Sequence, residues 1–153
     1  MSTQTTEHDI VSYFKDNPVM VLGTVGEHGK PHGAAVYGCP TTASEVYFIT
    51  KTDTQKFKNI LHNPHVSVTI VNTAENSSLQ AGGTARVVSD PAMVELIMGK
   101  MAVIYANSAD WLPPIAKLRA GPYQVVHIKM DHIRLARFLH AKPGSPEIYK
   151  ELK

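Results

Sequence analysis

The residues with the clearest capacity for binding chemistry lie in the segment 50–56, which reads Thr-Lys-Thr-Asp-Thr-Gln-Lys. An apolar run at 46–50 precedes it, and Phe57, Ile60 and Leu61 follow at helical spacing. A helix that begins directly after a strand presents unpaired amides with partial positive charge. Hydroxyl groups and lysines gathered there can complete a phosphate site. The candidate residues of this turn are Thr50, Lys51, Thr54, Gln55 and Lys56.

The same turn has a second interpretation that involves no ligand. Asp53 or Thr54 could cap the helix while Lys51 and Lys56 are solvated, and most capped helices in proteins bind nothing. Taken alone, the local pattern favours this second interpretation. The order of the surrounding elements therefore has to decide between the two.

The elements around the turn are mostly strands. Alternating or continuous apolar runs predict strands at residues 19–25, 31–38, 46–50, 65–71, 79–88, 123–130 and 133–138, the last two joined by a turn at 131–132. Helical spacing predicts helices at 7–16, after the 50–56 turn up to Asn63-Pro64, and from Asp90-Pro91 through Ile104, with residues 106–120 irregular. Short turns join most neighbours, so we expect a mainly β protein, an antiparallel barrel with attached helices.

Composition indicates the number of domains and the cellular compartment, and it argues against some classes of partner. With 153 residues, 43% of them hydrophobic and 18% charged, the chain is expected to fold as one domain, with probable tails at 1–6 and 142–153. One cysteine and a start unlike a signal peptide predict a cytoplasmic protein, and no apolar run approaches the roughly 20 residues of a membrane span. A net charge of +2 without a basic stripe argues against nucleic acid as a partner.

The order of these elements resembles a known family. The strand end Phe48-Ile49-Thr50, then Thr54-Gln55-Lys56, then Asn63-Pro64 before a strand, is similar to the pattern of the pyridoxamine 5′-phosphate oxidase-like split-barrel flavoproteins. The glycine-led segment 83–87 and the closing Ile133-Arg134-Leu135 extend the likeness. The resemblance implies an antiparallel split β-barrel of Greek-key type with helices packed at its ends. It also implies a homodimer that holds flavin mononucleotide (FMN) between its two protomers.

The resemblance carries roles onto particular residues. Backbone around Val36, Tyr37 and Gly38 would flank the isoalloxazine ring, and Gln80 would make a polar contact to it. Ile49 and Thr50 would meet the flavin or its ribityl chain, while Thr54 and Lys56 would hold the phosphate, with Lys51 and Gln55 in the same turn. No catalytic residue is assigned.

The chain departs from the oxidase pattern at three basic positions. Ala34 stands where the pattern has an arginine, a lysine position falls near Cys39, and Gln55 replaces the arginine before Lys56. The region after Leu139 also lacks a counterpart of the substrate-binding arginines. The resemblance therefore favours an FMN-dependent oxidoreductase acting on an unidentified small substrate over a vitamin B6 oxidase.

Several alternatives stay open at this point. The protein could be a non-catalytic flavin-binding or flavin-storage module, or a relative that uses the deazaflavin F420. It could handle haem, with His127, His132 or His140 as axial ligands. The eight histidines show no metal-binding spacing, so no metal site is predicted. We expect Tyr105 and Trp111 to be core or dimer-contact aromatics.

Overall fold

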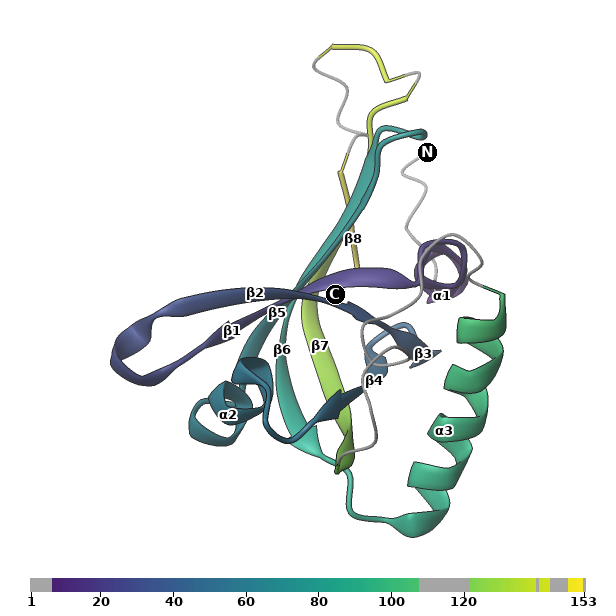
Figure 1. The fold of residues 1–153 in the computed structure, drawn as a ribbon. Helices are drawn as coiled ribbons and strands as arrows, with labels where there is room; N and C mark the ends of the chain where they lie inside the picture. Colours follow the sequence, from purple (N-terminus) through teal and green to yellow (C-terminus); the bar gives the residue numbers. More distant parts are fainter. Residues whose placement is uncertain (1–6, 108–121, 140, 144–148, 153) are drawn as a thin grey trace.

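The structure is a computed structural model that describes residues 7–107, 122–139, 141–143 and 149–152. Three helices accompany one sheet (Figure 1). The helices are α1 Glu7–Asp16, α2 Gln55–His62 and α3 Pro91–Ala106, with a 3₁₀ turn η1 at Glu27–Gly29. The strands are β1 Val19–Val25, β2 Pro31–Tyr37, β3 Cys39–Thr42, β4 Glu45–Lys51, β5 His65–Asn72, β6 Ser77–Val87, β7 Tyr123–Arg137 and β8 Tyr149–Leu152.

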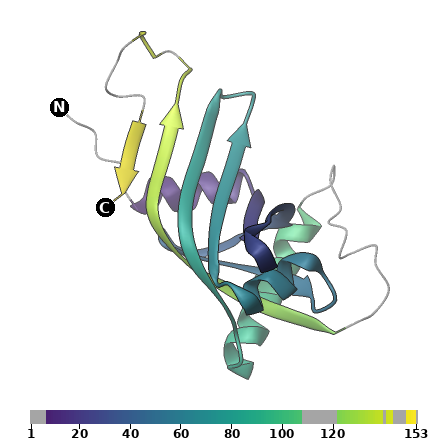
Figure 2. The same ribbon diagram turned by 90° about the vertical axis from the view of Figure 1, so that its left-hand side faces the viewer.

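All strand pairs are antiparallel, in the order β2-β1-β5-β6-β7-β4-β3, with β8 added to β7. The two strands at the ends of this order, β2 and β3, are separated in the chain by Gly38 alone, so the sheet has to curl to bring its ends together (Figures 1 and 2). Gly38 is tightly packed, since a Cβ there would lie 3.0 Å from Met20 Sδ and 3.1 Å from Val46 Cγ2. The predicted antiparallel split barrel is confirmed.

Strict alternation of side chains gives the sheet two apolar faces. Inside the curl, Leu22, Phe48 and Val68 pack with Phe14 of α1. On the opposite face of β4, a second cluster is covered by α3. This second cluster comprises Tyr37, Cys39, Tyr47, Ile49, Ile97, Met101 and Val125. The 50–56 turn thus leaves a strand that is buried on both faces.

α3 begins as its sequence predicts. The Asp90 carboxylate accepts a hydrogen bond from the Ala92 amide at 3.1 Å, with Pro91 in the first turn. Ile97 and Met101, which are spaced one helical turn apart, are fully buried. The described part of the chain holds no helix long and apolar enough to span a membrane.

β7 corrects the prediction of two strands joined by a turn at 131–132. It is one strand of 15 residues in which His132 has a positive φ of 47°, and its register with β6 shifts between Gln80 and Gly82. His132 and Ile133 form a bulge opposite Ala81, because Asp131 pairs with Gly82 and the ladder to β6 resumes with Arg134 opposite Gln80. One edge of β7 therefore pairs first with β4 and then, past the bulge, with β8.

Three further expectations needed correction. The connection at 39–42 forms the short strand β3, although Pro40 supplies no amide to the ladder. The predicted tail 142–153 contains β8, which pairs with β7. Leu61, expected on the buried face of α2, is 65% exposed, since Phe57 and Ile60 already fill the contact with the sheet. Residues 108–121, which include Trp111, lie outside the described residues.

Candidate functional site

The turn between β4 and α2 is closed by its own threonines. The hydroxyl oxygens of Thr50 and Thr54 lie 3.0 Å apart, and the Thr54 hydroxyl donates to the Lys51 carbonyl at 2.9 Å. Thr54 is the N-cap of α2 with extended backbone, yet its side chain accepts no hydrogen bond from the first-turn amides. These amides are therefore left without the side-chain cap that Thr54 would have supplied.

Lys56 lies in the first turn of α2 beside these amides. Its side chain is half-buried, and burial lowers the pKa of its ammonium group below the usual range. Lys56 forms no ion pair within the described part of the chain. A partly desolvated ammonium without a counter-ion is stabilised when an anion binds beside it. The local structure thus presents a cation and uncapped amides together, which suits a phosphate monoester.

Gln55 has a different role in the structure, because its side chain is engaged within α2. Its Nε2 donates to Asn59 Oδ1 at 2.7 Å, and Asn59 Nδ2 donates to the hydroxyl of Thr24 at 3.0 Å. That hydroxyl in turn donates to the His32 carbonyl at 3.4 Å. This chain of hydrogen bonds ties α2 to β1 and β2 and fixes the direction in which the helix begins. Sequence reasoning missed Asn59, and its polar side chain between Phe57 and Ile60 was the available signal.

Replacing Asn59 by alanine is expected to lower the free energy of unfolding by about 1–3 kcal/mol. Asn59 is 3% exposed, so its removal leaves the buried Thr24 hydroxyl without the amide that donates to it. Gln55→Ala removes only the exposed end of the same network and should cost less. Urea denaturation of both variants measures the difference, and equal costs would contradict a structural role centred on Asn59.

The residues expected near the flavin ring fall on two faces. Tyr37 and Ile49 belong to the cluster under α3, where Tyr37 meets Tyr105 edge-on at 5.3 Å between ring centroids. Burial raises the pKa of Tyr105 to about 12, so this tyrosine stays neutral. Val36 points into the opposite core, and Gly38 donates its amide to the Pro18 carbonyl at 2.8 Å. The structure therefore brings together Tyr37, Ile49 and, at the end of the same strand, Thr50.

Gln80 lies far from the turn. It pairs with Arg134 on β7, whereas Thr50 pairs with Gln124, ten residues away along the same strand. At about 3.3 Å per residue, that separation is about 30 Å. A flavin held at Thr50–Lys56 cannot also contact Gln80 of the same chain.

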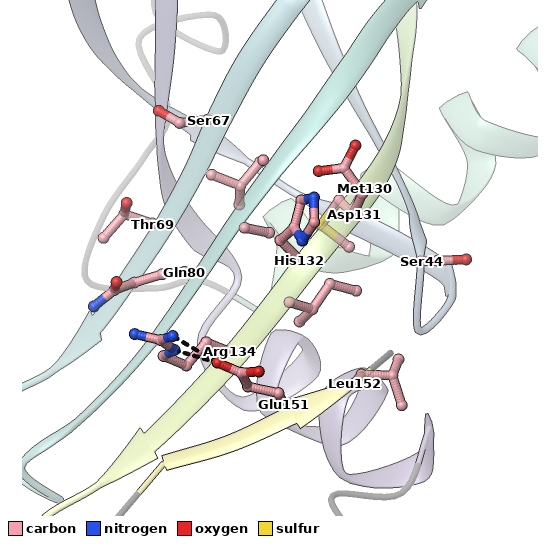
Figure 3. Close-up of a pocket in the computed structure, with 14 residues that line it drawn as sticks. Ser44, Ser67, Thr69, Gln80, Met130, Asp131, His132, Arg134, Glu151 and Leu152 are labelled. Atoms are coloured by element: carbon pink, nitrogen blue, oxygen red, sulfur yellow. Dashed lines mark hydrogen bonds and ion pairs between the residues drawn. The ribbon is translucent and has the colours of Figure 1, made fainter.

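Gln80 instead lines a pocket of about 930 Å³ beside the bulge of β7 (Figure 3). The figure shows Thr69 and Gln80 on one side, Asp131 and His132 at the centre, and the Arg134–Glu151 ion pair next to Gln80. The pocket size is within the range of small-molecule sites. The lining mixes these polar side chains with apolar ones such as Met130 and Ile133, and none of its residues belongs to the 50–56 turn.

His127 is unsuited to bind haem in this conformation. It is 3% exposed, its Nε2 lies 3.2 Å from the Glu45 carboxylate, and its Nδ1 is buried without a hydrogen-bond partner among the described residues. Its ring packs on Tyr47 at 4.8 Å between centroids. His132 is exposed at the bulge, and His140 lies outside the described residues.

The pKa of His127 is lowered, chiefly because burial disfavours the imidazolium; the charges of Arg86 and Lys129 add to this, while Glu45 opposes it. Above its ordinary pKa of 6.5, the ring is neutral in both the folded and the unfolded chain. As pH falls through 6.5, the unfolded chain takes up a proton that the folded chain resists, so stability is lost. Urea unfolding at pH 7.5 and pH 5.5 should therefore show a smaller loss for His127→Gln than for the parent protein. An equal loss would assign the pH dependence to other groups.

Comparison with known proteins identifies the family. The family model for pyridoxamine 5′-phosphate oxidase matches residues 6–137. The chain belongs to this family. No curated protein matches the chain. Among solved structures, a putative pyridoxamine 5′-phosphate oxidase from Listeria innocua is similar, with a TM-score of 0.65 and 22% identity over 84% of this chain and 95% of that one.

Two further structures of similar fold belong to proteins with other described roles. An F420 reductase aligns with a TM-score of 0.61 and 19% identity, covering 86% of this chain and 98% of that one. The haem storage protein HutZ from Vibrio cholerae aligns with a TM-score of 0.58 and 15% identity, covering 79% and 87%. At these identities the likeness shows the shared fold of the pyridoxamine 5′-phosphate oxidase family.

The chain lacks basic residues at three positions of the oxidase pattern. At two of them the described part of the structure shows no other basic side chain that takes their place. Ala34 is half-buried on β2, and Cys39 is buried in the cluster under α3. Burial raises the pKa of the Cys39 thiol, which disfavours the nucleophilic thiolate. At the third position, Gln55 serves the hydrogen-bond network of α2. Lys56 is thus the remaining basic side chain of the motif.

Proposed function

We propose that this member of the pyridoxamine 5′-phosphate oxidase family binds FMN, with the phosphate at the start of α2. The observation that carries the proposal is the closed Thr50–Thr54 turn, which leaves the first-turn amides uncapped beside the half-buried Lys56. The ring would extend along the end of β4 toward Tyr37 and Ile49, which share one cluster. Family membership supports the choice of a flavin, because the sequence resemblance to this family implies a phosphate contact at this turn.

We propose that the protein acts as a homodimer with the cofactor between protomers. The partners of Thr50 and Gln80 lie about 30 Å apart along β7. This separation supports the arrangement, since Gln80 could reach a flavin at Thr50 only from a second chain. α3 supports it as well. This helix carries only Glu95 and Lys100 as charged residues, and Leu96 and Val103 are 50% and 61% exposed. An apolar helix surface of this kind is typical of an interface.

Glutamate at both Leu96 and Val103 is expected to convert the dimer to monomers. The two residues are seven positions apart and therefore lie on one side of α3. Two charges buried at a contact would be severely unfavourable, while exposed positions tolerate them. Sedimentation analysis of the double variant, with Glu95→Gln as control, measures the outcome. A double variant that remains dimeric would place the interface elsewhere.

The proposed activity is that of an oxidoreductase acting on a small substrate, with a reduced nicotinamide as a suitable electron donor. Bound FMN supplies hydride or electron transfer. The contribution of this chain is to hold the phosphate at Lys56 and the first-turn amides of α2, which the Thr50–Thr54 turn leaves uncapped, and to present an apolar surface at Tyr37 and Ile49. Neither Cys39 nor His127 serves as a proton donor or nucleophile in this scheme, since both are buried and held in their neutral forms.

The absorption spectrum of the purified protein tests the cofactor, because FMN, F420 and haem have distinct bands. We expect a flavin spectrum, or quenching of FMN fluorescence when FMN is added to the apoprotein. No flavin band and no quenching would contradict the proposal. Multiple turnovers of flavin reduction by NADH or NADPH would support an oxidoreductase, and bound flavin that no donor reduces would favour a storage protein.

A further inference from the structure

A second pocket lies on another side of α2, between this helix and the β1–β2 hairpin. Its volume is about 540 Å³, which suits a small molecule. Figure 1 shows α2 beside the hairpin that forms the opposite wall. Its lining contains Gln55 but neither Thr54 nor Lys56, so the pocket adjoins the proposed flavin phosphate site without including its lysine. The lining residues that matter for its chemistry are Glu27, Lys30, His32, Gln55, Lys58 and His62.

The charge of this lining is positive. Lys30 approaches from the hairpin and Lys58 from α2, and neither forms an ion pair within the described residues. Glu27 is the only acidic side chain in the lining. Lys30 and Lys58 against Glu27 give the lining one net positive charge. Opposite walls that each supply a cation suit an anionic group placed between them.

The walls of the pocket are held in position before any ligand arrives. The Gly26 amide donates to the Lys30 carbonyl at 2.8 Å, which closes the tip of the hairpin. The Gln55–Asn59–Thr24 hydrogen bonds join α2 to β1. A Cβ at Gly26 would lie 2.9 Å from Asn59 Oδ1, so only glycine lets the hairpin approach the helix this closely. Pre-formed walls reduce the ordering cost of binding.

His32 is a further polar group in the lining of the pocket. Its Nδ1 is buried without a hydrogen-bond partner among the described residues, although the His32 carbonyl is bonded to Thr24. Buried polar atoms are nearly always partnered in native proteins. In the tautomer that carries its hydrogen on Nδ1, this imidazole can donate to an oxygen of a bound anion.

We propose that this pocket binds a small molecule through a phosphate monoester group. Two lysines acting as separate point charges, with imidazole donors nearby, suit the several oxygens of a phosphate. Among the described residues the lining has no arginine to favour the planar, bidentate recognition of a carboxylate. This site goes beyond the proposed flavin function and does not depend on it.

The test uses inorganic phosphate as the probe and backbone amide NMR of the FMN-saturated protein as the readout. We expect saturable shifts at residues 26–32 and 55–62, with little change at 50–54. Lys30→Ala with Lys58→Ala should weaken binding at least tenfold. Lys15→Ala with Lys142→Ala, which removes the same charge elsewhere, should not. Glu27→Gln should tighten binding about threefold or more, a gain that partial unfolding cannot produce.

The contrary outcomes are distinct. Absence of saturable amide shifts, or equal weakening of phosphate binding by both pairs of lysine substitutions, would contradict the proposal that this pocket binds phosphate. Equal affinity for acetate at matched ionic strength would overturn the phosphate class. Should FMN fail to bind, the same titration is run on the Lys56→Ala apoprotein. Shifts at 26–32 and 55–62 would then support the pocket even though the flavin proposal had failed, and their absence would overturn it.

Discussion

Lys56→Ala is expected to weaken FMN binding about 10- to 100-fold while riboflavin binding changes little. The ammonium of Lys56 would contact only the phosphate, and a hydrogen bond to a charged group is worth about 1.5–3 kcal/mol. Riboflavin lacks the phosphate, so it reports on the ring site alone. Fluorescence quenching titrations of both ligands measure the ratio of their affinities.

A loss of FMN affinity in Lys56→Ala has to be separated from destabilisation of the fold and from the general loss of a positive charge. The Lys56 side chain is half-buried without a counter-ion, so its removal relieves a desolvation cost and should leave the apoprotein at least as stable. Lys15→Ala removes an exposed lysine from α1, to which no binding role is assigned, and should leave FMN affinity unchanged. Equal losses for FMN and riboflavin in Lys56→Ala would contradict the phosphate assignment.

Gly83→Ala is expected to lower the free energy of unfolding by about 1–3 kcal/mol, near the upper end of that range. A Cβ at Gly83 would lie 2.8 Å from the Lys129 carbonyl oxygen and 2.9 Å from Ile128 Cγ2. The carbonyl is part of β7, so relief requires the β6–β7 ladder to move apart. Urea denaturation of the apoprotein measures the cost.

Gly82→Ala is the matched control for this prediction. A Cβ at Gly82 would lie 2.9 Å from Asp131 Oδ1, the end of a side chain that can rotate away. We expect a change within about 0.5 kcal/mol, as for substitutions that the structure accommodates. Similar costs at Gly82 and Gly83 would show that loss of glycine itself, and not contact with β7, sets the effect.

Much of the fold could be predicted from the periodicity of apolar residues and from the residues that start and end helices and turns. The alternation of Val66, Val68 and Ile70 predicts β5, and Asp90-Pro91 marks the start of α3. The errors arose where tertiary pairing overrides a local signal. Asp131-His132 has the composition of a turn, yet pairing with β6 on both sides keeps the chain extended through it.

The candidate site was only partly accessible from the sequence. The strand-to-helix turn at 50–56 was predicted from the order of the elements, but the hydrogen bonds of Thr50 and Thr54 that close it were not. The partner of Gln55 could not be predicted, because it depends on Asn59 being held against Thr24, 35 positions earlier in the chain. The separation of Gln80 from the turn was equally inaccessible, since it depends on the register of β6 and β4 against β7.

The division of one β7 edge between β4 and β8 has a consequence for association. Past the bulge, Ile133–Ala136 would present unpaired amides and carbonyls if β8 did not cover them. An open edge of this kind is a template for strand addition by another molecule. β8 therefore occupies the place on this edge where a foreign strand would pair, and the proposed homodimer would form through side-chain surfaces such as α3.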